Sequence, residues 1–259
     1  MTLVIERCDQ RLVKSNERVR DLGEVFTPNA TVQEMLDLLP ESIWAPHPSP
    51  TFFEPACGDG NFLVAILDRK LDHIDSEHTR TNLPAGTDAG AAQFHALEAL
   101  ASIYAVDIST DNIIGGTEGH ELGARARLLT MFSEWNFTVL GKRLNEKSLA
   151  LRAARWIIEH NLIVGNMLPF EVVGGLTGRD EIPLIEYIWQ PEKLSVSLSK
   201  TTLGAVLATE TEKVATMLSL FPPALPEQFW RGKAANLAEA ERVKAPMLRG
   251  PARNGTRRR

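Results

Sequence analysis

The residues best suited to chemistry lie in one short run, Glu54-Pro-Ala-Cys-Gly-Asp-Gly60, which follows an apolar segment. The run places an acid at the end of a predicted buried strand and two glycines in the turn after it. Such a turn lets a ligand approach the backbone where a Cβ would collide. A dinucleotide fingerprint needs a third glycine where this chain has Leu63, and the carboxylates of Glu54 and Asp59 would repel a phosphate. The run therefore favours a ligand with a positive group, although a tight turn without any ligand has the same pattern.

A second acid, Asp107, ends another apolar run and is expected to lie near the glycine turn. A carboxylate there can accept hydrogen bonds from both hydroxyls of an adenosine ribose. It follows Gly60 by 47 residues, where about twenty are usual. A polar insertion at residues 72–90, predicted to be an exposed loop, accounts for the excess. The alternative is that Asp107 only precedes the next helix.

Strands and helices must alternate to bring these residues to one edge of a sheet. The predicted strands are 51–55, 102–107, 162–164 and 182–189. The predicted helices start at Thr27-Pro28, with Thr27 as N-cap, and at Asn61, and cover 91–100, 144–160 and 203–220. This alternation predicts an α/β fold with a doubly wound, mostly parallel sheet. Because such sheets usually have five or six strands, four predicted strands indicate an incomplete one.

Three motifs in order resemble the N6-adenine DNA methyltransferases of restriction-modification systems and phages. Gly23-Glu-Val-Phe-Thr-Pro28 resembles the cofactor motif that precedes the sheet in one class of that family. Phe53-Glu-Pro-Ala-Cys-Gly-Asp-Gly-Asn-Phe-Leu63 resembles the first sheet motif, and Tyr104-Ala-Val-Asp-Ile108 the second. The likeness covers about residues 18–170 and implies a Rossmann-like methyltransferase fold.

The resemblance implies that S-adenosylmethionine is the cofactor. Glu54 would pair with its ammonium group, and Asp107 would hold its ribose hydroxyls. The backbone amides that would close around its carboxylate are those of Ala56, Gly58 and Gly60. The residues that would line the adenine or the sulfonium are Phe26, Thr27, Pro28, Ile108 and Asn166.

The catalytic signature of that family, Asn-Pro-Pro followed by Tyr or Phe, occurs nowhere in the chain. In the family the Asn side chain and a Pro carbonyl accept the amino hydrogens of the target adenine, and the aromatic ring stacks on the flipped base. The nearest match is Gly165-Asn-Met-Leu-Pro-Phe170. In one interpretation Asn166, Pro169 and Phe170 form a stretched catalytic loop. In the other, which the sequence favours, Asn166 contacts the adenine of the cofactor and the catalytic motif is absent.

The chain divides by composition into three predicted parts. Residues 1–45 form a helical segment with the first motif, 46–220 the α/β domain, and 221–259 a Pro-rich linker and a basic disordered tail. Residues 231–259 contain nine Lys and Arg and two Glu, which gives this part a formal charge of +7. Because the net charge of the chain is −5, residues 1–230 carry −12. An acidic body does not resemble a protein that grips nucleic acid unaided, so the tail is a candidate DNA-binding arm.

Overall composition excludes several classes of protein. With 44% hydrophobic residues, the 259-residue chain can build a core, so dominant disorder is excluded. No apolar run is long enough for a membrane span, and the early charges do not resemble a secretory signal. Cys8 and Cys57 make no disulfide framework and no metal site, and the histidines have no metal-ligand spacing. We therefore expect a cytoplasmic protein without a metal.

Three hypotheses for the function remain open at this point. The first is an adenine DNA methyltransferase, of phage or prophage type, whose catalytic loop is altered or supplied by a partner chain. The second is a non-catalytic protein that binds S-adenosylmethionine as a subunit, decoy or regulator. The third is a methyltransferase that acts on a protein or a small molecule. The expected partners are DNA and a second subunit, which can be another copy of the chain.

Overall fold

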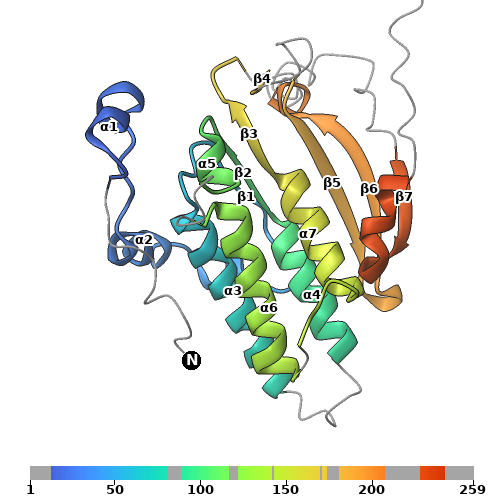
Figure 1. Ribbon diagram of the computed structural model, residues 1–259. Helices are drawn as coiled ribbons and strands as arrows, with labels where there is room; N and C mark the ends of the chain where they lie inside the picture. The colour runs from blue at the N-terminus through green and yellow to red at the C-terminus, as the bar shows by residue number, and fades with distance from the viewer. Residues whose placement is uncertain are drawn as a thin grey trace, which may run out of the picture.

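A computed structural model describes residues 13–80, 89–116, 122–141, 143–169, 171–173, 181–207 and 228–242. These residues form a mixed α/β structure with two separate sheets (Figure 1). Among the described residues, no helix is both long enough and apolar enough to span a membrane.

The first sheet has the strand order β1-β2-β3-β4 and is mostly parallel. β1 (Phe52–Glu54), β2 (Ile103–Asp107) and β3 (Leu162–Asn166) run parallel, and β4 (Glu171–Val172) pairs with β3 in the opposite direction. The prediction of an α/β fold with a mostly parallel sheet is confirmed. The carboxyl ends of the three parallel strands lie at one edge, which we call the carboxyl edge; their starts form the amino edge.

Within the described ranges, five helices connect the parallel strands. The connection from β1 to β2 contains α3 (Asn61–Arg80) and α4 (Ala89–Ala101). The connection from β2 to β3 contains α5 (Thr110–Ile113), α6 (Ala124–Leu140) and α7 (Leu149–Asn161). The four longer helices pack on one another and on the sheet through one large apolar core, whose largest members include Leu63, Leu67, Leu97, Phe132 and Ile157.

The second sheet is antiparallel and has the order β5-β6-β7. Its strands are β5 (Pro183–Gln190), β6 (Ser195–Thr202) and β7 (Gln228–Lys233), with the 3-10 helices η3 (Pro191–Lys193) and η4 (Ala234–Arg242). The ring of Trp189 in β5 packs edge to face on the ring of Phe94 in α4, with the ring centroids 5.2 Å apart. Leu237 of η4 is fully buried.

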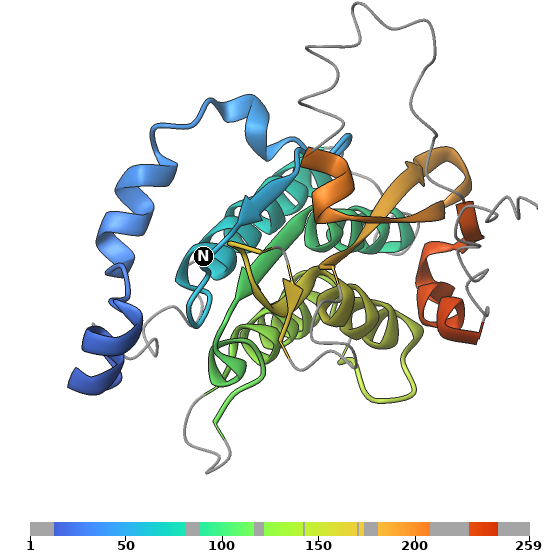
Figure 2. The ribbon, with the colours of Figure 1, turned by 90° about the horizontal axis from the view of Figure 1, so that it is seen from above.

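The N-terminal segment contains α1 (Asn16–Leu22), α2 (Asn29–Leu36) and η2 (Glu41–Trp44). It lies on one side of the parallel sheet, and the second sheet lies on the other (Figures 1 and 2). The Ser15 hydroxyl accepts a hydrogen bond from the amide of Arg18 and so caps α1. The segment from Gly23 to Pro28, which carries the first motif, connects α1 to α2 without regular structure.

The structure corrects several predictions of local structure. Of residues 72–90, predicted as an exposed loop, 72–80 continue α3, 81–88 lie outside the described residues, and 89–90 begin α4. Leu71 and Ile74 are spaced to reach the core, while the residues between them stay polar. The strand predicted at 182–189 exists as β5, but it belongs to the antiparallel sheet. In the helix predicted at 203–220, residues 203–207 are helical and 208–220 lie outside the described residues.

Further differences concern the ends of the chain and one long helix. Residues 228–242, predicted as part of the linker and tail, form β7 and η4, while residues 243–259 lie outside the described ranges. The N-cap of α2 is Pro28 instead of Thr27. α6 was not predicted, although Leu128, Phe132 and Trp135 follow the helical period and are all buried.

Candidate functional site

The glycine turn after β1 has a conformation that only glycine adopts without strain. Gly58 has φ +55° and Gly60 has φ +94°. A Cβ on Gly58 would lie 2.9 Å from Cε1 of Phe26, and one on Gly60 would lie 2.9 Å from Cβ of Ala124. Both backbone conformation and close packing therefore require these glycines.

Asp107 at the end of β2 holds the glycine turn in place. Its Oδ2 accepts a hydrogen bond from the Gly58 amide at 2.9 Å. Its Oδ1 accepts from the Ser109 amide at 2.8 Å and from Nδ2 of Asn112 at 3.1 Å. The sequence predicted that the turn and this acid lie close together, and the structure joins them by a direct hydrogen bond. Asp107 is 8% exposed, because these donors surround it.

The first motif lies against the same turn. The Phe26 ring lies beside Gly58, and the Thr27 carbonyl accepts a hydrogen bond from Nδ2 of Asn61 at 3.1 Å. Nζ of Lys14 lies 5.8 Å from the centroid of the Phe26 ring, within range of a cation–π contact. Pro28 is exposed at the start of α2. Three segments that are distant in sequence therefore meet at the carboxyl edge.

A charged network that sequence reasoning missed fastens the N-terminal segment to this edge. Arg18 binds the Glu24 carboxylate with two nitrogens and donates to Oδ2 of Asp111 at 2.9 Å. Lys14 donates to the same Asp111 oxygen at 2.9 Å and to Oδ1 of Asn112 at 2.8 Å. The two cations lower the pKa of Asp111 against the opposing effect of burial, and the bond to Glu24 raises the pKa of Arg18.

Asn112 connects this network to Asp107. Its Nδ2 donates both to Oδ1 of Asp107 and to Oε2 of Glu24, the latter at 3.0 Å, and its side chain is buried. Asn112 therefore links Asp107 to Glu24, in the segment that carries Phe26. The polar residue five positions after the strand-ending acid was the only sequence signal for this link.

Arg127 of α6 supports the turn from its other side. Its Nη1 donates to the Asp59 carbonyl at 2.7 Å and lies 3.1 Å from the Asp59 carboxylate, and its Nη2 donates to Oδ1 of Asn61 at 2.9 Å. Burial raises the pKa of Asp59, and Arg127 opposes that shift. The charge of Asp59, expected from sequence to face a ligand, is thus paired with Arg127.

Glu54 keeps more free hydrogen-bonding capacity than Asp107. Its Oε1 accepts from the Ala56 amide at 3.3 Å, and its side chain is half-buried. Ile108, the residue after Asp107, is 48% exposed. Burial raises the pKa of the Cys57 thiol, and the negative charges of Asp107 and Glu54 raise it further. The carboxylates of Asp107 and Glu54 therefore both lie close enough to Cys57 to affect its thiol.

The candidate catalytic residues lie at the end of β3. Val164 is the register partner of Asp107, so Asn166 stands two residues beyond the acid on the neighbouring strand. Oδ1 of Asn166 accepts from the Leu168 amide at 3.1 Å. Pro169 is exposed, and Phe170 lies outside the described residues. Asn166 therefore stands near the second motif, beside β2 and not beside β1.

The residues fit S-adenosylmethionine in part. The second carboxylate oxygen of Glu54, the Phe26 ring and the exposed Ile108 suit an ammonium group and an adenine face. The three amides expected to bind the cofactor's carboxylate already have acceptors: the Ala56 amide in Glu54, the Gly58 amide in Asp107, and the Gly60 amide in the Cys57 carbonyl. Asp107 has used three of about four lone-pair positions, so at most one ribose hydroxyl fits without rearrangement.

Within the described ranges, no group of three or more His, Cys, Asp or Glu side chains is arranged to hold a metal ion. Comparison of the chain with family models, with curated proteins and with solved structures finds no match to any of them.

Proposed function

We propose that the chain binds S-adenosylmethionine at the carboxyl edge and serves the methylation of adenine N6 in DNA, with a catalytic loop that is altered or supplied by a partner chain. One observation carries this proposal: the hydrogen bond from the Gly58 amide to Asp107, with Phe26 packed on the same glycine. It brings together the three segments on which the resemblance rests.

Each end of the cofactor has a candidate partner on this edge. Glu54 pairs with the ammonium group. The carboxylate is assigned to the first-turn amides of α3, which lack acceptors within the helix and carry the positive end of its dipole. Asp107 accepts a ribose hydroxyl, and Ile108 packs on the adenine. When bound, S-adenosylmethionine supplies an electrophilic methyl group on its sulfonium.

The strand arrangement supports a Rossmann-like methyltransferase domain. β1, β2 and β3 follow one another in the parallel sheet, with helices in each connection. Because Asn166 lies on the strand next to Asp107, it suits hydrogen bonding to the cofactor's adenine better than a catalytic role. This favours the second interpretation of Asn166, Pro169 and Phe170.

A second candidate function is that of a non-catalytic subunit that binds the cofactor. Among the described residues, β1 is the last strand on its side of the sheet. The residues that hold the methyl acceptor would have to come from beyond that strand. Together with the missing Asn-Pro-Pro motif, this supports a chain that binds the cofactor and leaves the methyl acceptor to other residues or to a partner.

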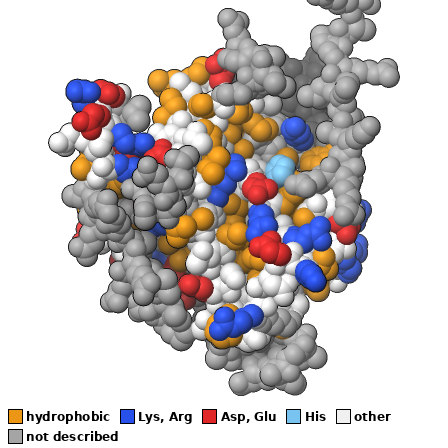
Figure 3. Space-filling model, viewed as in Figure 1, with side chains coloured by type: hydrophobic (Ala, Val, Ile, Leu, Met, Phe, Trp, Pro, Cys, Tyr) orange, Lys and Arg blue, Asp and Glu red, His pale blue; other side chains and the backbone are white. Residues whose placement is uncertain are grey.

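The proposed partners follow from the distribution of charge, and the proposed location follows from a free cysteine. On the face drawn in Figure 3, the basic side chains of the described residues lie among acidic ones. Contact with DNA is therefore assigned to the basic tail or to a partner subunit. A cytoplasmic location is supported by Cys57, a free and buried thiol.

Calorimetry with S-adenosylmethionine tests the cofactor assignment. Glu54→Gln should weaken binding by about 1–3 kcal/mol, because it removes one charge-assisted contact. Glu34→Gln, at an exposed position of α2, is the matched control and should bind like the unchanged chain. Absent binding, or equal affinity in both variants, would show that the assignment is wrong.

The reaction is tested in a host that expresses the chain. Mass spectrometry of the host DNA should detect N6-methyladenine, and resistance to restriction enzymes should identify the methylated sequence. Cofactor binding without any methylated adenine, also after addition of host extract, would favour the non-catalytic subunit.

A further inference from the structure

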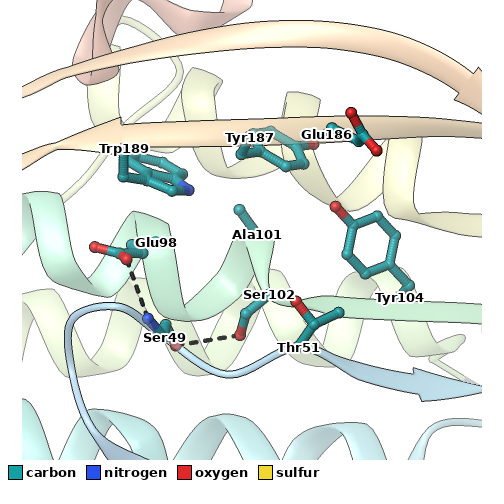
Figure 4. Close-up of a pocket in the computed structure, with 9 residues that line it drawn as sticks. All are labelled: Ser49, Thr51, Glu98, Ala101, Ser102, Tyr104, Glu186, Tyr187 and Trp189. Carbon is teal, nitrogen blue, oxygen red and sulfur yellow. Dashed lines mark hydrogen bonds between the residues drawn. The ribbon is translucent and has the colours of Figure 1, made fainter. Parts of the chain in front are cut away.

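A cavity of about 210 Å³ opens at the amino edge of the parallel sheet, opposite the candidate cofactor site. It lies between the starts of β1 and β2 on one side and β5 on the other (Figure 4). It is lined by Ser49, Thr51, Glu98, Ala101, Ser102, Tyr104, Glu186, Tyr187 and Trp189. Sites for drug-sized ligands measure roughly 300–1,000 Å³, so this cavity suits a group about as large as one long side chain.

Three of the hydroxyl groups that line the cavity direct their hydrogens to acceptors in the protein. Tyr104 donates to the Ile185 carbonyl at 2.5 Å, Tyr187 to Oδ1 of Asn161 at 2.9 Å, and Ser102 to the Ala99 carbonyl at 2.7 Å. These oxygens therefore have only acceptor capacity left for a ligand. A group that donates hydrogen bonds suits the cavity better than one that accepts them.

The two carboxylates of the cavity differ in how far they are already paired. Glu98 is 3% exposed and accepts from Nδ1 of His47 at 2.8 Å and from the Ser49 amide at 3.1 Å. Glu186 is exposed, and no hydrogen bond or ion pair joins its side chain to another described residue. Its charge contributes to the raised pKa of Tyr104, after the larger effect of burial. Glu186 is thus the negative group that a ligand meets.

Aromatic rings complete the cavity wall. Tyr187 and Trp189 lie on the same side of β5, with ring centroids 6.0 Å apart and planes inclined by 17°. Aromatic faces beside a carboxylate attract ammonium and guanidinium groups through cation–π contacts. Among the described residues that line the cavity there is no Lys, Arg or His. The ammonium of Lys70 donates to Oγ of Ser49 at 2.7 Å.

From this combination we infer that the cavity is a binding site for a single ammonium or guanidinium group, held by Glu186 at its entrance and by acceptor oxygens and aromatic rings inside. The group belongs either to a small free amine or to a Lys or Arg side chain of another polypeptide. The site is independent of the proposed cofactor site.

The test uses the indole N–H signals in the NMR spectrum of the full chain, titrated with n-butylammonium and n-butylguanidinium. Trp189→Phe identifies the signal of Trp189 among the five tryptophans. We expect the Trp189 signal to shift saturably with either cation and not with 1-butanol, which has the same size and no charge. Equal shifts with 1-butanol, or no saturable shift with either cation, would overturn the inference.

Glu186→Gln should weaken binding of the two cations by about three- to tenfold, because it removes one partly screened charge. Glu192→Gln, an exposed acid of η3 outside the cavity, should leave it unchanged. Equal effects of the two variants would also overturn the inference. The peptide Gly-Gly-Arg-Gly-Gly separates the two sources: tighter binding than n-butylguanidinium indicates a side chain of a partner, and its exclusion indicates a free amine.

Discussion

The carboxyl edge and the amino edge of the parallel sheet each contain a buried carboxylate and a freer one. At the carboxyl edge, Asp107 accepts hydrogen bonds from three residues and holds the glycine turn, while Glu54 accepts only one. At the amino edge, Glu98 holds residues 47–49, while Glu186 is unpaired among the described residues. In both places the buried acid supports the backbone, and the freer one is the better candidate for contact with a ligand.

The two edges differ in how their charges are balanced. The cations of the carboxyl edge, Lys14 and Arg18, are 12% and 24% exposed and form ion pairs. At the amino edge Lys70 is 1% exposed and donates to Oγ of Ser49 and to the Pro50 carbonyl. Burial lowers the pKa of Lys70 to about 8, although the charge of Glu98 opposes the shift. We therefore expect larger effects on stability from the amino edge.

The largest effect is expected from Lys70→Met. The change leaves Glu98 without a nearby buried cation and leaves two acceptors unpaired, so the free energy of unfolding should fall by about 3–5 kcal/mol. Urea unfolding followed by circular dichroism measures it. Lys147→Met, at an exposed position before α7, should change stability by less than about 0.5 kcal/mol. A small effect of Lys70→Met would remove the distinction between the two edges.

A somewhat smaller effect, about 2–3 kcal/mol, is expected from Gly58→Ala. The change forces a positive φ on alanine and a Cβ against Phe26. Gly141→Ala is a matched control, because Gly141 has φ +65° and nothing within 4 Å of its added Cβ; it should cost about 1 kcal/mol. Equal losses of unfolding free energy in the two variants would show that the Phe26 contact contributes nothing.

The pH dependence of stability gives a separate measure of the amino edge. The unfolded chain binds a proton on Lys70 more tightly than the folded chain does, because folding lowers this pKa from 10.5 to about 8. The contribution of Lys70 to folding stability therefore rises with pH between about 8 and 10.5, by about 3 kcal/mol in total. Subtracting the stability of Lys70→Met from that of the unchanged chain at each pH cancels the contributions of the other titratable groups. A flat difference would contradict the assignment.

Asn112→Ala should lower the free energy of unfolding by about 1–2 kcal/mol, because it removes the amide that donates to both Asp107 and Glu24. Since Asn112 joins the N-terminal segment to the sheet, trypsin should also cleave faster at Arg18 and Arg20. Asn29→Ala, at the exposed start of α2, should leave both readouts unchanged. A loss of unfolding free energy without faster cleavage would mean that other contacts hold the N-terminal segment.

The smallest effect on stability is expected from removal of the tail. Truncation after Arg242 keeps η4 and should change the unfolding free energy by less than about 0.5 kcal/mol, while it weakens retention of DNA at low salt. Truncation after Gly232 removes buried Leu237 and Ala240 and should destabilise the chain. Retention of DNA that depends neither on salt nor on the tail would rule out the basic arm.

Much of the carboxyl edge was predictable because its signals are local. Gly58 and Gly60 follow an apolar run, and Asp107 ends another, so parallel pairing alone brings them to one edge. The residues around them were not predictable. Arg18, Arg127 and Asn112 reach the site from helices, and Lys14 reaches it from just before α1; a polar residue in a helix usually indicates only a solvent-exposed face.

β6 of the second sheet was missed for a different reason, whereas β5 was predicted as a strand. β6 alternates serines with apolar residues, and Ser197 and Ser199 are buried together with Val196 and Leu198. The alternation is short, because Val196 and Leu198 are the two apolar residues of the run and Ser, Lys and Thr make up the rest. Serine also gives no apolar signal, so the run from Ser195 to Thr202 resembles a loop.

The sequence by itself determined which residues must turn sharply, which runs must be buried, and that a mostly parallel sheet brings Gly58 and Asp107 to one edge, because glycine dihedrals and hydrophobic periodicity act over a few residues. Only the tertiary structure decided which acids remain available. Asp107 and Glu98 are more fully paired than Glu54 and Glu186, because each of them accepts a hydrogen bond from a residue 49 or more positions away in the chain.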